Sequence, residues 1–506
     1  MKPDNEPIIV DTDELTPPAI DDSLWKRRVG AYAIYDAPGT PKCSIYVQGY
    51  NRLHKTKYAV ECVLKYTHDV DYELILVDNG SDDGTFEYFQ SVQFENKKII
   101  RITKNLGAGF PFEHVRRVFS GNYLVCVPND VYVTKNWLSN LLKCYESDLR
   151  IGLVMPVSSN VSNLQQVDIE FSDFDDMQKK AEQYNVSDPA KWDERLRLIT
   201  VLNIWPRYVL DTVGIADPAF LHDFMEDDIA ARLRINGYKL ILCKDTWICH
   251  DHDFRNLEDK DAAAFNNSLE NGRATFKEKY HGLDAWDDID NYERSLLSPI
   301  DKVALNTEEM SVLAIDPRCG TPILELRNRL RRRGIIDVYS NAFTTQAKYY
   351  SALQYAANEA QCDRIDFIQS YYAVGMFDIV VLCESLNTYS SPVSLLQSLC
   401  MFLAPGGLLL FKLRNTDNIQ TLLRTVGFGN DNDEDLPSAL PINEVFECMK
   451  LFGMQDISVV AAEALPHNEG ERNKIQALLQ TINEGAQDND LIRLLTKDFI
   501  IKAVKG

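Results

Sequence analysis

The chain has 506 residues and a formal net charge of −22, with hydrophobic residues at 45% and charged residues at 25% of the composition. This length predicts two to four domains, each with its own core. The acidic balance argues against nucleic acid and against an anionic membrane surface as partners, because both require clusters of lysine and arginine. No apolar run reaches the roughly 18 residues of a membrane span, and the acidic, proline-containing stretch Met1–Asp22 lacks the pattern of a secretory signal.

The eleven cysteines are scattered, and no two have the C-x-x-C spacing of a zinc or redox motif. Most lie inside apolar runs, where a free thiol is an ordinary small core residue. Unpaired thiols are typical of a reducing compartment, so we expect a cytoplasmic protein.

The first half of the chain alternates between strand and helix patterns. Residues 1–40 show no periodicity and predict a poorly ordered arm. From there on, the expected strands are Cys43–Val47, Leu74–Val77, Ile99–Ile102, Tyr123–Val127 and Ile151–Met155, and the expected helices are Thr56–Tyr66, Thr85–Val92, Phe112–Phe119 and Lys135–Tyr145. This alternation predicts an α/β domain with a mainly parallel sheet, whose ligands bind at the carboxyl ends of the strands.

Further along the chain, Asn160–Arg195 is expected to be a loop with a short helix, and a helix at Asp227–Asn236 leads into a strand at Tyr238–Cys243. A second α/β pattern begins at Ser311, with strands at Ile335–Tyr339, Phe377–Cys383 and Leu408–Leu413. The predicted domains are therefore an arm at 1–40, an α/β domain at 41–283, a linker at 284–310 and a second α/β domain at 311–506.

Two candidate ligand loops follow expected strands. Residues 77–85 (Val-Asp-Asn-Gly-Ser-Asp-Asp-Gly-Thr) place Asp78 at a strand end, where a carboxylate can accept hydrogen bonds from a nucleobase. Residues 105–110 (Asn-Leu-Gly-Ala-Gly-Phe) place glycines before a helix, whose N-terminus favours an anion. Each pattern also fits a plain turn that binds nothing, since Ser81–Asp83 suit a helix cap.

Two further segments have side chains suited to a divalent metal. Residues 125–131 (Val-Cys-Val-Pro-Asn-Asp-Val) put Asp130 just after an apolar run, and a carboxylate there can hold a metal that bridges a diphosphate. Residues 247–252 (Trp-Ile-Cys-His-Asp-His) follow another strand and offer imidazole or carboxylate. The alternatives are a surface aspartate that opens a turn and a core histidine with satisfied hydrogen bonds.

A fifth segment is the acid run Glu226, Asp227 and Asp228 in front of a helix. Acids at this position interact favourably with the helix dipole, so a capping role is one interpretation. The other is a general base that deprotonates an acceptor hydroxyl.

In this order and spacing, the five segments resemble the family-2 glycosyltransferases with the nucleotide-diphosphosugar-binding (type A) fold. The resemblance covers about Cys43 to Tyr280 and includes Tyr50-Asn51-Arg52 after the first strand and Asn271-Gly272-Arg273 near its end. It implies that the first α/β domain is a Rossmann-like, type A glycosyltransferase domain.

The resemblance also implies a nucleotide-sugar site. In this family the acid of the Val-Asp-Asn segment contacts the base, which points to Asp78, and the loop before the first helix touches the nucleotide. The implied nucleotide-sugar-binding residues are Gln48, Tyr50, Asn51, Asp78, Asn79, Asn105, Gly107 and Asn129.

A Mn²⁺ or Mg²⁺ ion is implied as well. Asp130 matches the last acid of the family's D-x-D-like metal motif, and His250 resembles the histidine that supplies a third contact in many type A enzymes. Pro128 stands where the motif usually has Asp or Asn, so we expect fewer protein ligands, with diphosphate oxygens and water completing the shell.

The acid run matches the family's E-D motif with an ambiguity of one residue. If the motif is aligned by its distance from Arg232, Met225 takes the place of the family's Glu. If it is aligned by residue identity, Glu226-Asp227 takes the place of the family's Glu-Asp. We expect Asp227 as the base and Glu226 as the alternative, and the sequence does not decide between these two and Asp228. The implied reaction is a single in-line displacement with inversion. It moves a hexose or N-acetylhexosamine from a nucleotide sugar, UDP being the expected nucleotide, to a hydroxyl of a glycan or protein.

Residues 311 to about 415 resemble a class I methyltransferase of the Rossmann-like type, with Phe377–Leu382 matching its fourth strand. The family's G-x-G-x-G loop aligns with residues 316–320 (Asp-Pro-Arg-Cys-Gly), which keep one glycine of three, and Val338-Tyr339-Ser340 supplies no acid for the ribose hydroxyls. Side chains at positions that need close backbone approach obstruct S-adenosylmethionine. We therefore expect no S-adenosylmethionine, and a structural, dimerising or acceptor-recruiting role for this domain.

Two other functions stay open. One is a bifunctional glycosyltransferase and S-adenosylmethionine-dependent methyltransferase. The other is a catalytically inactive sugar-nucleotide-binding scaffold, which the missing acid at Pro128 permits. The expected partners are a nucleotide-diphosphate sugar and a glycan or protein acceptor, without nucleic acid or a membrane span, and a homodimer is allowed.

Overall fold

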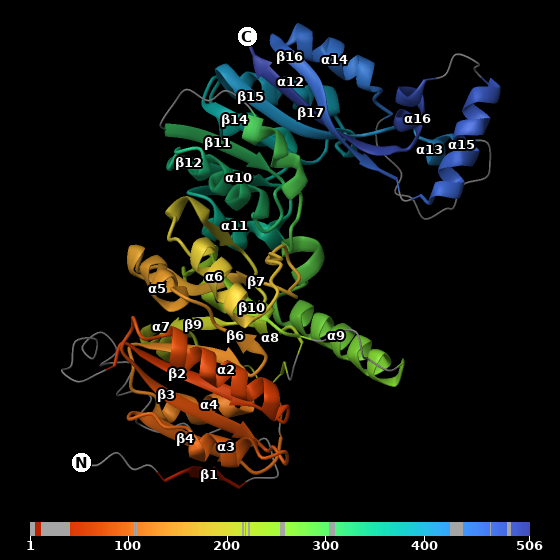
Figure 1. The fold of residues 1–506 in the computed structure, drawn as a ribbon. Coiled ribbons are helices and arrows are strands. Elements are labelled where there is room, and N and C mark those ends of the chain that lie inside the picture. The colour runs from red at the N-terminus through yellow and green to blue at the C-terminus, as the bar shows by residue number, and fades with distance from the viewer. Residues whose placement is uncertain are drawn as a thin grey trace. The chain divides into compact units, whose positions relative to one another are not determined.

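The computed structural model describes residues 6–11, 41–105, 107, 109–214, 217, 219–220, 223–252, 259–302, 309–425, 439–465, 467–482 and 487–506. The chain divides into two compact units, Met1–Asp290 and Asn291–Gly506 (Figure 1). Each unit is an α/β structure built on one large sheet, which confirms the predicted fold class.

The sheet of the first unit has the strand order β1-β4-β3-β2-β5-β9-β7-β10-β6, with β8 paired to β10. Its strands are β1 (Ile8–Val10), β2 (Cys43–Gly49), β3 (Tyr72–Asn79), β4 (Lys97–Ile102), β5 (Tyr123–Pro128), β6 (Val131–Tyr132), β7 (Ile151–Ser158), β8 (Trp192–Arg195), β9 (Asn203–Pro206) and β10 (Lys239–His250). Strands β1 to β5 pair in parallel, β9 runs antiparallel to β5 and β7, and β6 and β8 run antiparallel to β10.

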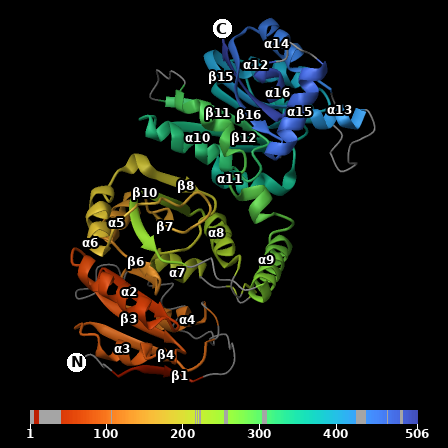
Figure 2. The ribbon, with the colours of Figure 1, turned by 45° about the vertical axis from the view of Figure 1, so that its right-hand side comes forward.

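Helices cover both faces of this sheet (Figure 2). The helices of this unit are α2 (Leu53–Tyr66), α3 (Thr85–Ser91), α4 (Phe110–Val118), α5 (Trp137–Ser147), α6 (Phe174–Tyr184), α7 (Arg207–Val213), α8 (Met225–Ile235) and α9 (Asp259–Lys279), with short turns η1 (Pro189–Lys191) and η3 (Ala285–Ile289). Helix α2 shows why these segments are helical, since its buried residues Thr56, Ala59, Val63 and Tyr66 recur every three or four positions. No helix in the described part of the chain combines the length and apolar character needed to cross a membrane.

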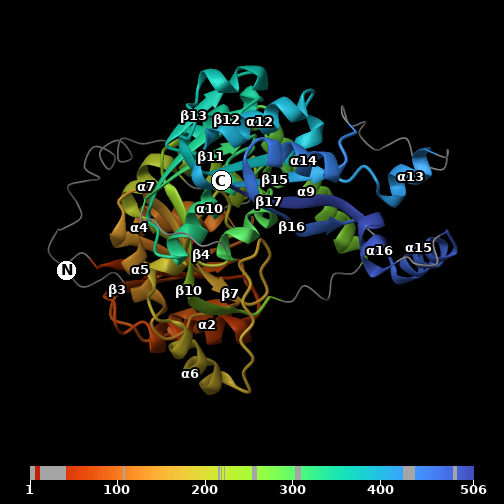
Figure 3. The ribbon, with the colours of Figure 1, turned by 90° about the horizontal axis from the view of Figure 1, so that it is seen from above.

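The sheet of the second unit has the order β13-β12-β11-β14-β15-β17-β16. Its strands are β11 (Glu309–Ile315), β12 (Asp337–Thr344), β13 (Glu359–Cys362), β14 (Phe377–Ser385), β15 (Leu403–Arg414), β16 (Met454–Ala464) and β17 (Thr496–Lys505). Its helices are η4 (Arg294–Lys302), α10 (Thr321–Arg332), η5 (Ala347–Tyr349), α11 (Tyr350–Ala356), η6 (Ile365–Ser370), η7 (Leu386–Thr388), α12 (Pro392–Phe402), α13 (Ile419–Thr425), α14 (Ile442–Leu451), α15 (Glu469–Ile482) and α16 (Asp488–Leu494). Figure 3 shows α13, α15 and α16 together beyond one end of β16 and β17.

The structure differs from the sequence prediction in two segments that were expected to be irregular. In the predicted arm, Ile8–Val10 forms β1 against β4, whereas residues 12–40 lie outside the described residues. The units divide at Asp290, within the predicted linker 284–310. On either side of that point the segment forms η3 and η4, because Leu296, Leu297 and Ile300 supply an apolar face that is fully buried.

Strand β12 shows a further difference, because it ends at Thr344 rather than near Tyr339. Its last residues, Ala342 and Phe343, are buried, so the apolar pattern continues beyond a polar interruption at Ser340 and Asn341. The segment that follows, Thr344-Thr345-Gln346, also carries no acid.

Gly121 is the tightest position of the first sheet. It lies in the turn before β5, and a Cβ placed there would lie 2.5 Å from the backbone carbon of Cys43 and from the backbone nitrogen of Ser44. We predict that Gly121→Ala lowers the free energy of unfolding of the first unit by about 1–3 kcal/mol, since overpacking forces the backbone of β2 or β5 to move.

Urea unfolding followed by tryptophan fluorescence measures this effect in the full chain, because all six tryptophans precede Asp290. Gly470→Ala in α15 is the matched control, since its Cβ would meet a flexible side-chain atom of Asn468 at 3.2 Å. An unchanged fluorescence midpoint for Gly121→Ala would contradict the packing interpretation.

Candidate functional site

The carboxyl end of β3 holds a buried acid with an unsatisfied oxygen. Asp78 is fully buried, and its Oδ1 accepts a hydrogen bond from the Ser81 backbone N–H at 3.0 Å. No described residue donates a hydrogen bond to Oδ2, and the Nε of Arg101 lies 3.6 Å from it. Burial raises the pKa of Asp78, although its bonds to Ser81 and the charge of Arg101 oppose the rise. A buried, unpaired acceptor is costly unless a ligand completes it.

Hydrogen bonds made by asparagine residues connect the loops around Asp78 to one another. Asn51 donates its backbone N–H to Ser81 Oγ at 2.9 Å and accepts the backbone N–H of Asp82 at 3.1 Å. Asn79 donates to Asn105 Oδ1 at 3.1 Å and to the carbonyl of Gly107 at 3.2 Å.

The loop after β5 joins the same set of contacts. Asn129 donates to the carbonyl of Asn51 at 3.2 Å and to Thr56 Oγ1 at 3.1 Å. Gln48 is half-buried near the end of β2, and Tyr50 is 46% exposed. The predicted nucleotide-site residues therefore lie at the ends of β2 and β3 or in loops that follow strands, and hydrogen bonds between these loops hold them at one edge of the sheet.

Three side chains form a cluster with the composition of a metal site. Asp130, His250 and His252 each place one ligand atom within 4.8 Å of the others. His252 Nδ1 lies 3.3 Å from Asp130 Oδ2, and His250 Nε2 lies 3.9 Å from Asp130 Oδ1. The strands bring them together, because β6 follows Asp130 and pairs antiparallel with the end of β10 at His250.

The protonation of the cluster suits a cation. Burial lowers the pKa of His250, which favours the neutral imidazole. Its Nδ1–H donates to the carbonyl of Asn160 at 2.9 Å, so the lone pair of Nε2 can bind a metal. Burial opposes ionisation of Asp130, but the hydrogen bond from His252 and the two imidazoles lower the pKa of this carboxyl below its ordinary value. Two imidazoles and one carboxylate fit Mn²⁺ and similar transition metals.

The sequence prediction did not include His252 among the metal ligands. The sequence feature that could have identified His252 is the His-Asp-His spacing, because alternate side chains of an extended segment point to the same side. The intervening Asp251 faces elsewhere, since its carboxylate pairs with Lys55 Nζ at 3.0 Å and accepts from Tyr132 Oη at 2.9 Å.

The acid run lies in the first turn of α8, and its three members have different surroundings. Asp228 is fully buried and accepts from Arg232 Nε at 2.8 Å, Lys279 Nζ at 2.6 Å and Tyr280 Oη at 2.6 Å. Asp227 is buried against the guanidinium of Arg197, which also binds Asp290 at 3.1 Å.

Glu226 differs from its two neighbours. It is half-buried, and no described side chain bonds to its carboxylate. Burial, followed by the charge of Asp227, raises the pKa of Glu226 to about 7. A carboxylate with these properties is suited to proton transfer near neutral pH.

Part of the first unit is similar to a known protein family. Residues 44–191 match the sequence model of Glycosyl transferase family 2. The chain contains a family-2 glycosyltransferase domain. The matched residues of this domain include Asp78 and Asp130, whereas the acid run and the two histidines lie beyond them.

A curated relative and several solved structures are similar to parts of the chain. An uncharacterized glycosyltransferase of Bacillus subtilis (strain 168), YfnE, is 26% identical over 108 residues, which are 21% of this chain and 28% of that protein. The chain thus spans little more than a quarter of that relative's length.

Among solved structures, GalNAc-T7 with UDP, GalNAc and Mn²⁺ has a TM-score of 0.37 and 12% identity, covering 50% of this chain and 53% of that one. The mannosyltransferase PcManGT from Pyrobaculum calidifontis, with GDP-Man and Mn²⁺, has a TM-score of 0.34 and 15% identity, covering 66% and 81%. A SAM-dependent methyltransferase from Archaeoglobus fulgidus has a TM-score of 0.30 and 16% identity, covering 46% and 98%.

In the second unit the strand order reverses between β11 and β14. Side chains near the carboxyl ends of these strands contact one another. Tyr292 lies with its ring 4.1 Å from the Arg318 guanidinium and donates its hydroxyl to Glu384 at 2.8 Å. Asp316 accepts from Tyr389 Oη at 2.6 Å, and both Asp316 and Arg318 have the positive φ that glycine usually supplies.

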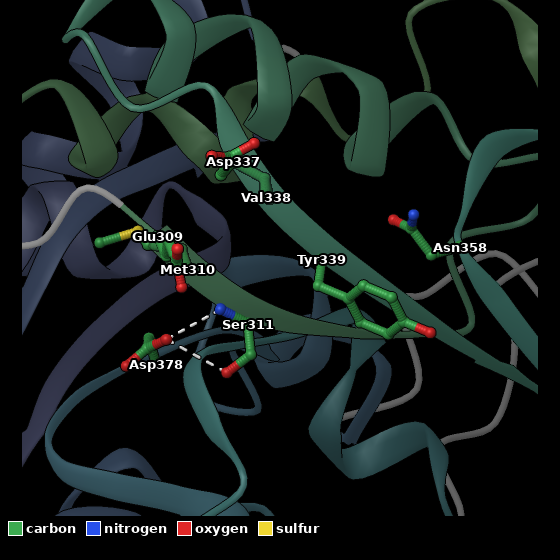
Figure 4. A pocket seen from close by; sticks show the side chains of 8 residues that line it. All are labelled: Glu309, Met310, Ser311, Asp337, Val338, Tyr339, Asn358 and Asp378. Atoms are coloured by element: carbon green, nitrogen blue, oxygen red, sulfur yellow. Dashed lines mark hydrogen bonds between the residues drawn. The ribbon is translucent and has the colours of Figure 1, made fainter.

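A pocket of about 610 Å³ lies at the opposite, amino-terminal edge of the same sheet (Figure 4). Glu309 and Asp337, the first residues of β11 and β12, line it together with Asp378, whose carboxylate accepts the backbone N–H of Ser311 at 2.8 Å. Because ligands of such sheets bind at the carboxyl ends, this pocket is separate from the candidate sites.

The metal cluster predicts a binding measurement. Calorimetric titration of the full chain with Mn²⁺ should give an affinity at least about tenfold lower for His252→Ala and for Asp130→Ala, because each removes one of three protein ligands. His68→Ala, an exposed histidine of the same unit, is the matched control. Wild-type affinity in His252→Ala would remove His252 from the ligand set.

Proposed function

We propose that the protein is a metal-dependent, inverting glycosyltransferase that moves a hexose or N-acetylhexosamine from a UDP-sugar to a hydroxyl of a glycan or protein acceptor in the cytoplasm. The observation that carries the proposal is the pair of features at one sheet edge. One is Asp78, with its buried, unbonded oxygen. The other is the cluster of Asp130, His250 and His252. The first suits the N–H edge of a nucleobase, and the second suits a cation that holds a diphosphate.

Each group has a separate task in this mechanism. Asp78 accepts a hydrogen bond from the base, while Asn51, Asn79, Asn105 and Asn129 keep the surrounding loops in place. Asp130, His250 and His252 would hold the metal, which would supply charge stabilisation to the departing diphosphate. Because the displacement is direct, no side chain of the protein acts as a nucleophile.

The contacts favour Glu226 as the general base over Asp227, which the sequence prediction preferred. Asp227 is neutralised by Arg197, and Asp228 is saturated by three donors. Glu226 takes the proton of the acceptor hydroxyl as the new bond to the anomeric carbon forms.

The second unit has no cofactor role in this proposal. Tyr292, Arg318 and Glu384 occupy the edge where S-adenosylmethionine would bind, and they satisfy one another. A structural, dimerising or acceptor-recruiting role is consistent with these contacts.

The proposal predicts metal-dependent release of UDP. Wild-type protein incubated with a panel of UDP-hexoses and UDP-N-acetylhexosamines should release UDP in the presence of Mn²⁺. Removal of the metal with a chelator, or Asp130→Ala, should lower the rate by at least about 100-fold, since a metal at the leaving group contributes several kcal/mol. Unchanged turnover in Asp130→Ala would contradict the metal assignment, and no turnover with any donor would favour a non-catalytic scaffold.

The assignment of Glu226 predicts a pH dependence. A base must be ionised, and a raised pKa keeps Glu226 protonated at low pH, so kcat/KM should rise about tenfold between pH 6 and pH 8. The charged groups that act on it are Asp227, Asp223 and Arg197. Asp227→Asn removes a negative neighbour and should shift the acidic limb of the profile to lower pH.

Glu226→Gln should lower kcat by about 10²–10⁴-fold without weakening UDP binding. If Glu226→Gln retains wild-type kcat while Asp227→Asn loses it, Asp227 is the base and the present assignment is wrong.

A further inference from the structure

The residue that begins helix α8 has a strained backbone. Phe224 is the N-cap of α8 and has a φ of +65°, in the left-handed region that large side chains rarely adopt. Its side chain is only 3% exposed. A conformation of this kind is unfavourable and persists only where surrounding contacts hold it. It lies two residues before Glu226.

The contacts that hold Phe224 come from the end of helix α9 and the turn η3. Figures 1 and 2 show α9 beside α8. Helix α9 approaches so closely that a Cβ at Gly272 would lie 2.8 Å from Phe224 Cδ2 and 3.0 Å from the carbonyl oxygen of Asp223. The Phe224 ring packs against Phe276 and Trp286, with ring centroids 6.4 and 5.3 Å away.

A second set of contacts holds the other side of Glu226. Lys279 and Tyr280, at the end of α9, both bond to the buried carboxylate of Asp228 at 2.6 Å. Ser268 also donates to Asp223, so α9 binds residues before and after the acid. Breaking one bond to a buried carboxylate leaves it incompletely satisfied, which costs free energy. These contacts therefore oppose movement of α8 relative to α9.

The turn η3 is itself fixed to α9. Arg273 forms a two-pronged bond to Asp284 at 2.6–3.0 Å, and its guanidinium lies 4.8 Å from the Trp286 ring. The segment Ser268–Ile289, which we call the α9 clamp, therefore contacts Asp223, Phe224 and Asp228 from one continuous surface.

We propose that the α9 clamp positions Glu226 for proton abstraction. It does so by contacting Phe224, two residues before Glu226, and Asp228, two residues after it. This inference rests on the proposed function, because it assigns the clamp a task in that reaction. Lys279, Tyr280 and Gly272 are positioning residues and do not touch the reacting atoms. A displacement of the acid by about 1 Å is enough to lower the rate about 100-fold.

The test compares Lys279→Met, Tyr280→Phe and Gly272→Ala with wild type in the full chain. The expected result is a 10- to 100-fold loss of kcat, with the KM for the UDP-sugar and the calorimetric affinity for UDP with Mn²⁺ within about twofold of wild type. Lys279→Arg keeps a donor to Asp228 and should restore part of the loss. Lys450→Met, which removes an exposed ion pair to Glu447 in the second unit, and Gly470→Ala are the matched controls.

Tryptophan fluorescence identifies any variant that fails to fold, and Tyr280→Phe is the mildest of the three. A kcat within twofold of wild type in folded Tyr280→Phe and Lys279→Met would overturn the clamp while leaving the proposed function intact. An equal loss of UDP affinity and kcat would also overturn it, because that pattern indicates a general structural role. Absence of transfer by the wild type would overturn the proposed function, and the clamp with it.

Discussion

The first unit depends on one geometric constraint, the parallel pairing of β2, β3 and β5. Gln48 at the end of β2 pairs with Val77 of β3 on one side and with Pro128 of β5 on the other. The residues that follow these strands must therefore emerge at one edge of the sheet. Asp78, the Asn51 loop and Asn129–Asp130 reach a common edge for this reason, although they are far apart in the sequence.

Charge burial then gives each acid a different role. Asp228 and Asp227 are fully or almost fully buried, and each has cationic or hydroxyl partners that satisfy it, as buried carboxylates require. Asp78 Oδ2 accepts no hydrogen bond from a described residue, no described side chain bonds to Glu226, and burial raises the pKa of both acids. Perturbed carboxylates of this kind are typical of functional sites. Asp227 and Asp228 are thus satisfied within the protein, whereas Asp78 can accept a hydrogen bond from a ligand and Glu226 can accept a proton.

Local patterns in the sequence predicted strands at the positions of β2, β3, β4, β5, β7 and β10, and they placed Asp78 and Asp130 at or just after strand ends. Apolar periodicity and strand-end acids are short-range signals. They did not predict that β6 folds back on β10 and brings His252 to Asp130, since that pairing joins residues about 120 positions apart. Likewise, Asp227 binds Arg197, and Asp228 binds Lys279 and Tyr280. No local pattern connects these three partners to α8. In the second unit, the sequence did not predict the contact of Tyr292 with Arg318, which joins residues 26 positions apart.

A crystal structure of the full chain with UDP and Mn²⁺, with anomalous diffraction collected at the manganese edge, tests the central claim most directly. The account predicts one manganese peak bonded to Asp130, His250 and His252, and a uracil whose N–H donates to Asp78 Oδ2. A manganese bound elsewhere, or a nucleotide whose base lies away from Asp78, would contradict it.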